Sequence, residues 1–274
     1  MATSFPLTTY REEFIRIYEQ RTALLRDFVT THSIVQGREA TFLLVESNRS
    51  AVTRGPNGLI PANNSEQSQV TVTLKEAHDL QQITRFVDLT VQGDQRRIMQ
   101  ETGRTVINRE VDDEIIDALS DATTTVGAAA VITKPIVNEA ITRLFNNFIE
   151  NDGQIGGIIT PAAWAYLTDI PAFASADYVT DRPIMNGPEK RTFMGVTWMV
   201  HPRLPGVGTN SATMFLFHKS AVGHAMHMSG MQAVVGYDVE QDYTYARHTV
   251  FHGAKLLQNA GVVKILHDDS ALSS

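Results

Sequence analysis

The longest regular pattern of apolar and polar positions runs from Asp94 to Asp121 and predicts one long helix. Gly93 precedes it, and the carboxylate of Asp94 can cap the free N–H groups of a first turn. A helix of about 28 residues would span roughly 42 Å. Its apolar and small positions, with an irregular step before Val111, are Ile98, Thr102, Thr105, Val106, Val111, Ile115, Ala118, Leu119 and Ala122. Charged residues fill the other positions, so the helix is expected to lie across a sheet on one edge.

Two apolar runs within residues 33–75 predict an elongated β-hairpin. Residues 40–45 form one candidate strand, and residues 70–74 alternate polar and apolar, as in a strand with one covered face. The polar connection between them turns at Arg54-Gly55-Pro56-Asn57-Gly58. Connections of this length without a core are usually functional or mobile. Two interpretations stay open: a surface loop without fixed structure, or an arm that is ordered only by a partner.

The rest of the pattern predicts a mixture of helices and strands, which places the chain in the α+β class. Residues 85–91 alternate and lead into the long helix. A second helix is predicted over residues 134–150, a third after Thr160-Pro161, and a short one near Ser220. Strands are predicted at residues 158–159, 193–200, 214–218, 234–239, 243–250 and 262–266.

Composition narrows the classes of function. The 274 residues are 43% hydrophobic and 19% charged, which is ordinary for a folded domain. The net charge of -7 argues against a nucleic-acid clamp, because such proteins carry a basic surplus. The absence of cysteine excludes disulfides and thiolate-bound metals. No apolar run reaches the length of a membrane span, and the first residues lack a signal-peptide pattern, so we expect a protein made in the cytoplasm.

Motifs for catalysis are missing from the sequence. It contains neither a phosphate-binding loop nor a dinucleotide-binding glycine motif, since Gly206 and Gly208 lack the rest of that pattern. It also contains no nucleophile elbow and no HExxH zinc motif. We therefore expect no catalytic residues and no cofactor. The chain is better suited to a structural role in an assembly than to catalysis.

Histidines and acids are the remaining candidates for chemistry. His218, His224 and His227 fall within ten residues, and the last two would share one face of a helix. Zinc needs three or four ligands, and with no cysteine or acid nearby the simpler interpretation is hydrogen bonding to backbone or solvent. The same applies to His248 and His252. The consecutive acids 112–114 point in different directions on a helix, which predicts a solvated face and no shared ion.

The order of these elements resembles that of tailed-phage major capsid proteins with the Hong Kong 97 fold. The segment DQRRIMQETGRTVINREVDDEIIDAL, residues 94–119, is similar to the spine helix of that family. The segment IITPAAW at residues 158–164 is similar to the start of its axial domain. The segments FMGVTW and RLPG, residues 193–198 and 203–206, and GAKLL before GVV, residues 253–257 and 261–263, also resemble it. The resemblance covers nearly the whole chain.

The resemblance implies a division of the chain. It implies an N-terminal arm at residues 1–33 and an extended loop at residues 34–75, with Arg54, Gly55, Pro56, Asn57 and Gly58 at the tip that contacts a neighbouring subunit. Residues 76–129 and 236–274 would form a peripheral domain, and residues 130–235 an axial domain. The spine helix of the peripheral domain would use Asp94, Ile98, Val106, Val111, Ile115 and Leu119.

The resemblance also implies self-assembly into the hexamers and pentamers of an icosahedral head. The head would enclose double-stranded DNA without sequence preference, and would be built in the host cytoplasm and located in the virion. A portal, a separate scaffolding protein and decoration proteins are the implied partners, with no membrane contact. Some family members form a Lys–Asn cross-link. Lys75 and Asn57 match by residue type only, so we predict none.

Two alternatives stay open at this point. An encapsulin-type shell would use the same fold around a cargo enzyme, and the contents of the particle would distinguish it. A histidine-metal enzyme would use His218, His224 and His227, and triple replacement by Ala would abolish its activity.

Overall fold

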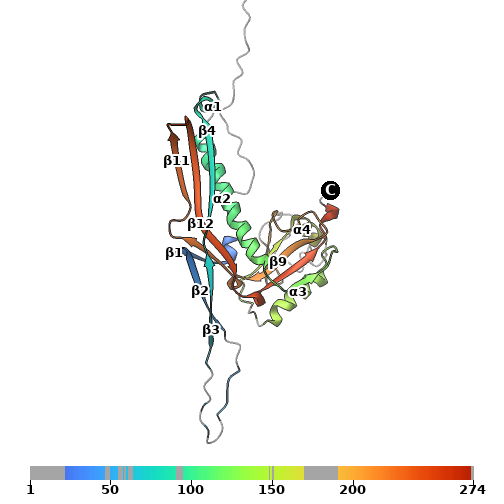
Figure 1. Ribbon diagram of the computed structural model, residues 1–274. Coiled ribbons are helices and arrows are strands. Elements are labelled where there is room, and N and C mark those ends of the chain that lie inside the picture. The colour runs from blue at the N-terminus through green and yellow to red at the C-terminus, as the bar shows by residue number, and fades with distance from the viewer. Residues whose placement is uncertain are drawn as a thin grey trace, which may run out of the picture.

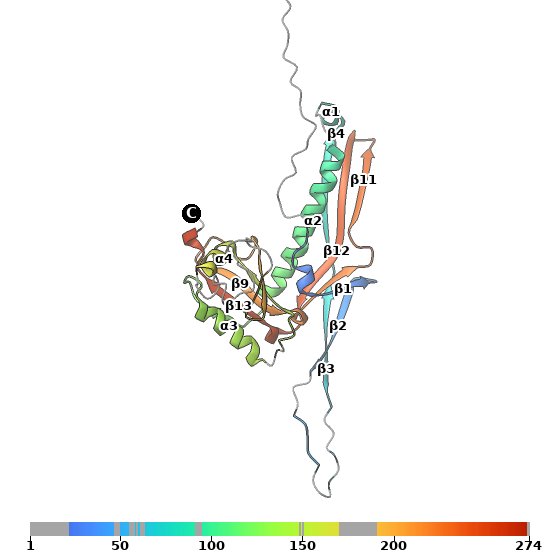
Figure 2. The same ribbon diagram turned by 180° about the vertical axis from the view of Figure 1, so that it is seen from behind.

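The computed structural model describes residues 22–46, 50–54, 58, 60, 64–90, 95–147, 149, 151–169 and 191–272. Within these residues the chain forms a long, narrow body and a rounder body joined side by side (Figure 1). The long body contains a five-stranded sheet and one long helix, and the rounder body contains a six-stranded sheet. A two-stranded ribbon extends from the end of the long body, as both views show (Figures 1 and 2).

The five-stranded sheet is organised around one strand, β12 (Tyr243–Leu256). Its first half lies between two antiparallel neighbours, so that Arg247 is opposite Val234 on one side and Leu80 on the other. Its second half pairs with a third antiparallel strand, which in turn pairs in parallel with a fourth. The four other strands are β4 (Lys75–Thr84), β11 (Gln232–Asp238), β10 (Val222–His227) and β1 (Thr30–Val35).

The predicted long helix is confirmed as α2 (Gln95–Ser120), and it packs on β12 and β4. The buried residues follow steps of four from Met99 through Gly103, Ile107, Val111 and Ile115 to Leu119. The predicted face is therefore wrong in the first half of the helix. Val106 is 38% exposed, and Ile107 is buried in its place. The irregular step in the prediction arose from that misplaced position. Asp94, the predicted N-cap, lies outside the described residues.

The predicted hairpin is confirmed as a ribbon of β2 (Glu39–Glu46) and β3 (Glu66–Thr73) in antiparallel register. Its root contains Ala40 and Val72, which are buried with Val35 and Leu74 against Ala225 of β10. Beyond the ribbon's root, the chain continues from β3 into β4 after the single residue Leu74. The alternating pattern at residues 85–91 is typical of a strand, but residues 85–90 form the short helix α1 (Arg85–Thr90).

The six-stranded sheet forms the core of the rounder body, and its strand order is β5-β13-β9-β6-β8-β7. Trp198 fills its centre and lies directly against Gly157, where a Cβ would overlap the indole ring. The strands are β5 (Thr125–Gly127), β13 (Val262–His267), β9 (Ala212–His218), β6 (Ile155–Ile159), β8 (Val196–Val200) and β7 (Arg191–Phe193).

Two helices accompany this sheet. The second predicted helix is confirmed as α3 (Lys134–Asn146), which ends before the predicted residue 150, and α4 (Pro161–Thr168) follows Thr160 as predicted. Pro lies in the first turn of each, where no N–H is needed. Four 3-10 turns complete the described chain: η1 (Arg26–Phe28), η2 (Lys219–Ala221), η3 (Asn259–Gly261) and η4 (Ser270–Leu272). The short helix predicted near Ser220 is only η2, and a strand follows it.

Candidate functional site

The outer end of the ribbon carries exposed apolar groups beside a cation. Val52 and Ile60 expose 46% and 70% of their surface. Arg54 is exposed, and its Nε donates to the carbonyl of Gly58 over 2.8 Å. Gly55, Pro56 and Asn57 of the predicted contact tip lie outside the described residues. The described part of the tip thus offers apolar surface and positive charge, and no acid lies in its sequence between residues 47 and 65.

The root of the ribbon is tied to the long helix by an ion pair. Lys75 lies 2.8 Å from a carboxylate oxygen of Glu114 on α2, and this hydrogen bond raises the pKa of Lys75. Beside the pair is an open cavity of about 720 Å³, whose lining includes Gly37, Arg38, Lys75, His227 and Phe251. The root of the ribbon is therefore held by the Lys75–Glu114 pair and by the apolar cluster around Ala225.

Asp112 forms a buried joint between three parts of the chain. Its carboxylate is wholly buried and accepts from the backbone N–H groups of Leu24 and Leu25, over 2.9 and 3.0 Å. Nε2 of His201, in the loop after β8, lies 3.6 Å away. Nδ1 of His201 accepts from the N–H of Arg203, which leaves Nε2 to carry the proton facing the carboxylate. One acid thus connects the N-terminal segment, α2 and the rounder body.

The neighbouring acids have different partners, as their angular spacing on a helix requires. Asp113 pairs with Arg203, and Glu114 pairs with Lys75. Burial raises the pKa of Asp113, against the opposing effect of the Arg203 guanidinium. The prediction that these acids do not converge is confirmed. The prediction of a solvated face is wrong for Asp112, because its partners come from segments about ninety positions away that a local pattern cannot indicate.

The histidines that were candidate metal ligands do not share one face. His224 and His227 lie on strand β10, where positions three apart point to opposite sides, so the predicted helical pairing is wrong. His218 bonds to Asp152 over 3.2 Å and to Ser220 over 2.7 Å, and His227 bonds to Ser229 over 2.8 Å. Among the described residues, no group of three or more His, Asp or Glu side chains is placed to hold a metal ion.

Three of the histidines that the sequence analysis named lie buried between α2 and the sheet. His224, His248 and His252 are each at most 3% exposed. The rings of His224 and His252 are 5.8 Å apart between centroids. Burial lowers the pKa of His224 to about 4, with the nearby His252 as a smaller cause, and burial also lowers the pKa of His252 and His248. Within the described part of the chain, Nδ1 of each ring has no hydrogen-bond partner.

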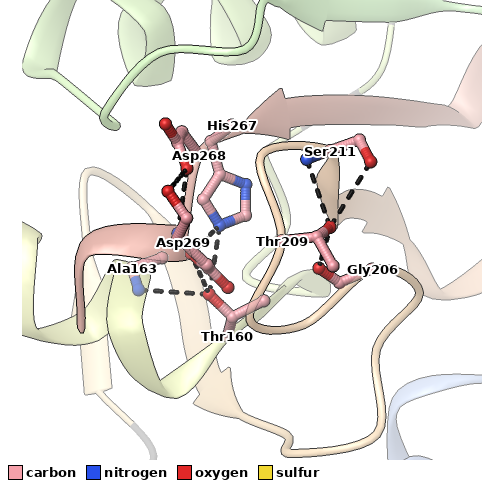
Figure 3. A network of polar contacts seen from close by, with 9 residues as sticks. Thr160, Ala163, Gly206, Thr209, Ser211, His267, Asp268 and Asp269 are labelled. Atoms are coloured by element: carbon pink, nitrogen blue, oxygen red, sulfur yellow. Dashed lines mark hydrogen bonds and ion pairs between the residues drawn. The ribbon is translucent and has the colours of Figure 1, made fainter. Parts of the chain in front are cut away.

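One buried cluster has the composition of a catalytic triad but not its function. Figure 3 shows Thr160, His267 and Asp269 meeting where β13 ends and α4 begins. His267 Nε2 lies 2.7 Å from Asp269 Oδ1, and a carboxylate only accepts, so Nε2 carries the proton. It cannot then take a proton from Thr160. The hydroxyl donates to Asp269 and accepts from the N–H of Ala163, each over 3.1 Å.

All three side chains of this cluster have no exposed surface, so no substrate can reach them. The cluster caps α4 and fixes the C-terminal residues to the six-stranded sheet. Thr160 before Pro161 was visible in the sequence as a helix start. His267 and Asp269 were missed, because only folding brings positions more than 100 residues away to that cap.

The described elements together form a long helix on a narrow sheet, a projecting ribbon and a rounder α/β body. Similar solved structures share this fold. They include the capsid of cyanophage P-SCSP1u, at 14% identity and a TM-score of 0.75, covering 95% of this chain and 92% of that one. A chain of Mycobacterium phage Che8 has 16% identity and a TM-score of 0.76, covering 97% and 98%. No curated protein sequence matches the chain.

Residues 3–269 match the model of the family described as phage capsid protein, and the chain belongs to that family. Its fold is that of tailed-phage capsid proteins of the Hong Kong 97 type, as the resemblance of the sequence implied. Its role is that of a major capsid protein, a structural component of the virion shell. No helix in the described part is long and apolar enough to cross a membrane.

Proposed function

We propose that copies of this chain assemble as hexamers and pentamers into an icosahedral head that encloses double-stranded DNA. The β2–β3 ribbon carries this proposal. It is a two-stranded sheet, and Leu43 and Val45 expose 58% and 55% of their surface on it. A lone two-stranded ribbon is at best marginally stable in water. A ribbon that overlaps an adjacent subunit gains burial and strand pairing only in the assembly.

The contact with the neighbour is proposed to include the tip at Arg54, Gly55, Pro56, Asn57 and Gly58. The apolar and positive character of the described tip residues supports this. The long body with α2 is proposed to be the peripheral part, and the body of the six-stranded sheet the axial part. The two bodies do not follow the bounds that the resemblance implied, 76–129 with 236–274 and 130–235, because β10 and β11 belong to the first body and β13 to the second. The chain therefore crosses between the two bodies repeatedly.

The other partners are proposals of the same kind. They are a portal, a separate scaffolding protein, decoration proteins and packaged DNA, met during assembly in the host cytoplasm. The net charge of -7 supports packaging of DNA without tight or sequence-specific binding. A basic inner surface would neutralise phosphates, and each neutralised phosphate would strengthen a salt-dependent affinity for DNA. We propose that the chain has no catalytic activity, and the inactive geometry at Thr160 supports this.

Deletion of Ser50 to Ser68 tests the role of the ribbon. We expect a folded subunit that no longer forms shells, because the tip and the end of the ribbon are lost while the buried root remains. Circular dichroism checks the fold, and negative-stain microscopy with light scattering checks assembly. Closed shells of normal size from the deletion variant would contradict the proposal. Nuclease-protected DNA inside wild-type particles, as opposed to protein cargo, identifies the contents.

A further inference from the structure

The two edges of the five-stranded sheet differ in how they are protected. Along the first half of β12, the edges are β4 on one side and β11 on the other. β4 carries Lys75, Glu76 and Asp79, and charged side chains on an edge discourage pairing with other chains. β11 reads QAVVGYD, with no charge before its last residue and no proline. The sheet thus protects one edge and leaves the other open to pairing.

The open edge also exposes apolar surface on both faces of the strand. Val234, Val235 and Tyr237 expose 41%, 38% and 46% of their surface, and Val239 just beyond exposes 81%. The helix α2 packs on β12 and β4, and β11 lies on the far side of β12 from it in both views (Figures 1 and 2). A strand with one neighbour and two exposed faces is poorly supported within a single subunit.

The chain itself contains a strand that fits this edge. Among the described residues, β2 pairs with β3 alone, so its other edge has no backbone partner along eight residues, against seven in β11. β2 exposes Leu43 and Val45, whereas the β3 residues opposite them are Gln69 and Gln67. Apolar side chains on adjacent strands stabilise each other when the strands pair. β2 is therefore the better match of the two ribbon strands.

Charge favours the same match. Arg247, opposite Val234 on β12, is exposed and has no ion-pair partner among the described residues. β2 begins and ends with glutamate. Because positions on a strand alternate between its two faces, only one of these two glutamates, seven positions apart, can share the sheet face of Arg247 in a strand laid beside β11.

We propose that β11 of one subunit pairs edge to edge with β2 of a second copy of this chain. The ribbon of one subunit then extends the sheet of its neighbour, in the order β3-β2-β11-β12-β4. This inference rests on the proposed assembly and adds to it the strand that receives the ribbon. Backbone hydrogen bonds supply the affinity, and the apolar pairs set the position of the strands.

A pair of substitutions in one row of the sheet tests the proposal. Val234 and Leu80 both lie opposite Arg247, on the open and the protected edge, and are similarly exposed at 41% and 53%. We expect Val234→Lys to reduce the yield of shells at least tenfold and Leu80→Lys to leave it near wild type. Normal shells from Val234→Lys, or equal losses from both variants, would overturn the proposal.

Cross-linking provides a second measurement that does not depend on loss of assembly. The chain has no cysteine, so each introduced thiol is the only one. Disulfides need Cα atoms roughly 4.4 to 6.8 Å apart. We expect shells co-assembled from Val234→Cys and Val45→Cys subunits, or Val234→Cys and Leu43→Cys subunits, to give disulfide-linked dimers on a non-reducing gel. Leu80→Cys with Val45→Cys should give none. Dimers only with Leu80→Cys would overturn the edge assignment.

The wild-type control separates this inference from the function on which it rests. If the wild-type chain forms no shells or rings even with scaffolding protein, the proposed assembly fails. If wild-type shells form and Val234→Lys shells are equally abundant but lose a bound decoration protein, assembly stands and the second copy is not the occupant of the edge.

Discussion

Buried polar side chains fix the joints of this subunit. Asp112 joins α2 to the N-terminal segment, and Thr160 with Asp269 joins α4 to the end of the chain. A buried polar group costs free energy unless it is hydrogen-bonded, so each joint tolerates only one arrangement of its segments. These residues therefore contribute to a unique fold more than their small number suggests.

Replacing Thr160 by Val keeps the side-chain shape but removes the hydroxyl. The variant loses the cap on the Ala163 N–H and the donor to Asp269. We expect the free energy of unfolding to fall by about 2 kcal/mol, since a lost cap costs about 1 kcal/mol and a buried carboxylate loses a donor. Urea unfolding of the unassembled chain measures this.

The matched control is Thr209→Val in the exposed turn drawn beside the cluster in Figure 3. The free energy of unfolding of Thr209→Val should fall by less than about 1 kcal/mol, because water replaces an exposed hydrogen bond. Equal losses of stability from the two variants would mean that the hydrogen bonds of the buried cluster stabilise the fold no more than exposed ones.

The buried histidines should make the subunit sensitive to acid. The pKa of His224 is near 4 in the folded state against an ordinary value of 6.5, so the unfolded chain binds more protons between these values. Stability is therefore highest above pH 6.5 and falls as the pH drops toward 4. A shift of this size corresponds to about 3 kcal/mol. The lowered pKa values of His248 and His252 act in the same direction.

Thermal unfolding between pH 7.5 and 4.5 measures this effect. His224→Met should lose less thermal stability on acidification than the wild type, because the group that resists protonation is gone. His78→Gln is the control, since that ring is 45% exposed and pairs with Glu76 at the surface. An unchanged pH dependence in His224→Met would contradict the assignment.

At this scale the sequence predicted few of the important residues. The helix cap at Thr160 follows from a local pattern, Thr before Pro. The burial of Asp112 does not, because its amide partners lie 87 and 88 positions away. The histidines were identified as candidates, but their roles depend on whether residues 222–227 form a helix or a strand. The short run Ala221-Val222-Gly223 before His224 is compatible with either.

The long helix shows how a single element is fitted to its sheet. Gly103 is buried in the middle of α2, where glycine normally costs about 1 kcal/mol relative to alanine. The reason for glycine is the ring of His248. A Cβ at position 103 would overlap Nδ1 of that ring and would lie 2.9 Å from Oδ2 of Asp79.

Gly103→Ala should therefore destabilise the chain although alanine favours helix. We expect a net loss of about 1 to 3 kcal/mol, because the buried ring or the helix must shift to relieve the overlap. Gln100→Ala on the exposed side of the same helix is the control, with an expected change of zero or a slight gain. Urea unfolding checks both, and a gain from Gly103→Ala would show that the ring moves freely.

Elements with strong periodicity were predictable, and their packing faces were less so. The range of α2 agrees with the prediction within one residue at each end, since a roughly helical spacing of apolar positions over seven turns indicates a helix even with one irregular step. Its buried face was misplaced because Val106 and Ile107 are both apolar and adjacent, and only Ile107 is buried whereas Val106 is 38% exposed. The short helix α1 reads as a strand in sequence, because six residues allow either period.

The whole molecule combines a rigid frame with a projecting ribbon. The two bodies are joined by repeated crossings of the chain and by the buried joint at Asp112, so they are held as one unit. Among the described residues, the contacts that anchor the ribbon lie toward its root, where Val72 and Leu74 are buried, Lys75 pairs with Glu114, and Lys255 donates to the carbonyl of Thr71. This distribution fits a subunit whose frame is complete before assembly and whose outer strands find partners in neighbouring copies.

Asp112→Asn tests the joint between the bodies. Each carboxylate oxygen accepts one backbone N–H, and asparagine can replace only one of them because its NH₂ group is a donor. The remaining N–H is left buried without an acceptor, which costs roughly 1 to 3 kcal/mol. The lost hydrogen bond lies between the N-terminal segment and α2. That segment should therefore detach from α2 before the rest of the protein unfolds.

Hydrogen exchange at the amides of Leu24 and Leu25 measures this detachment directly. We expect faster exchange there in Asp112→Asn, while the amides of the six-stranded sheet stay protected. Glu110→Gln is the control, because that acid lies two positions away on the exposed side of α2. Uniformly faster exchange would mean that Asp112 supports the whole fold. Unchanged exchange at Leu24 and Leu25 would mean that apolar packing of Leu25 against Ile115 and Leu119 holds the segment alone.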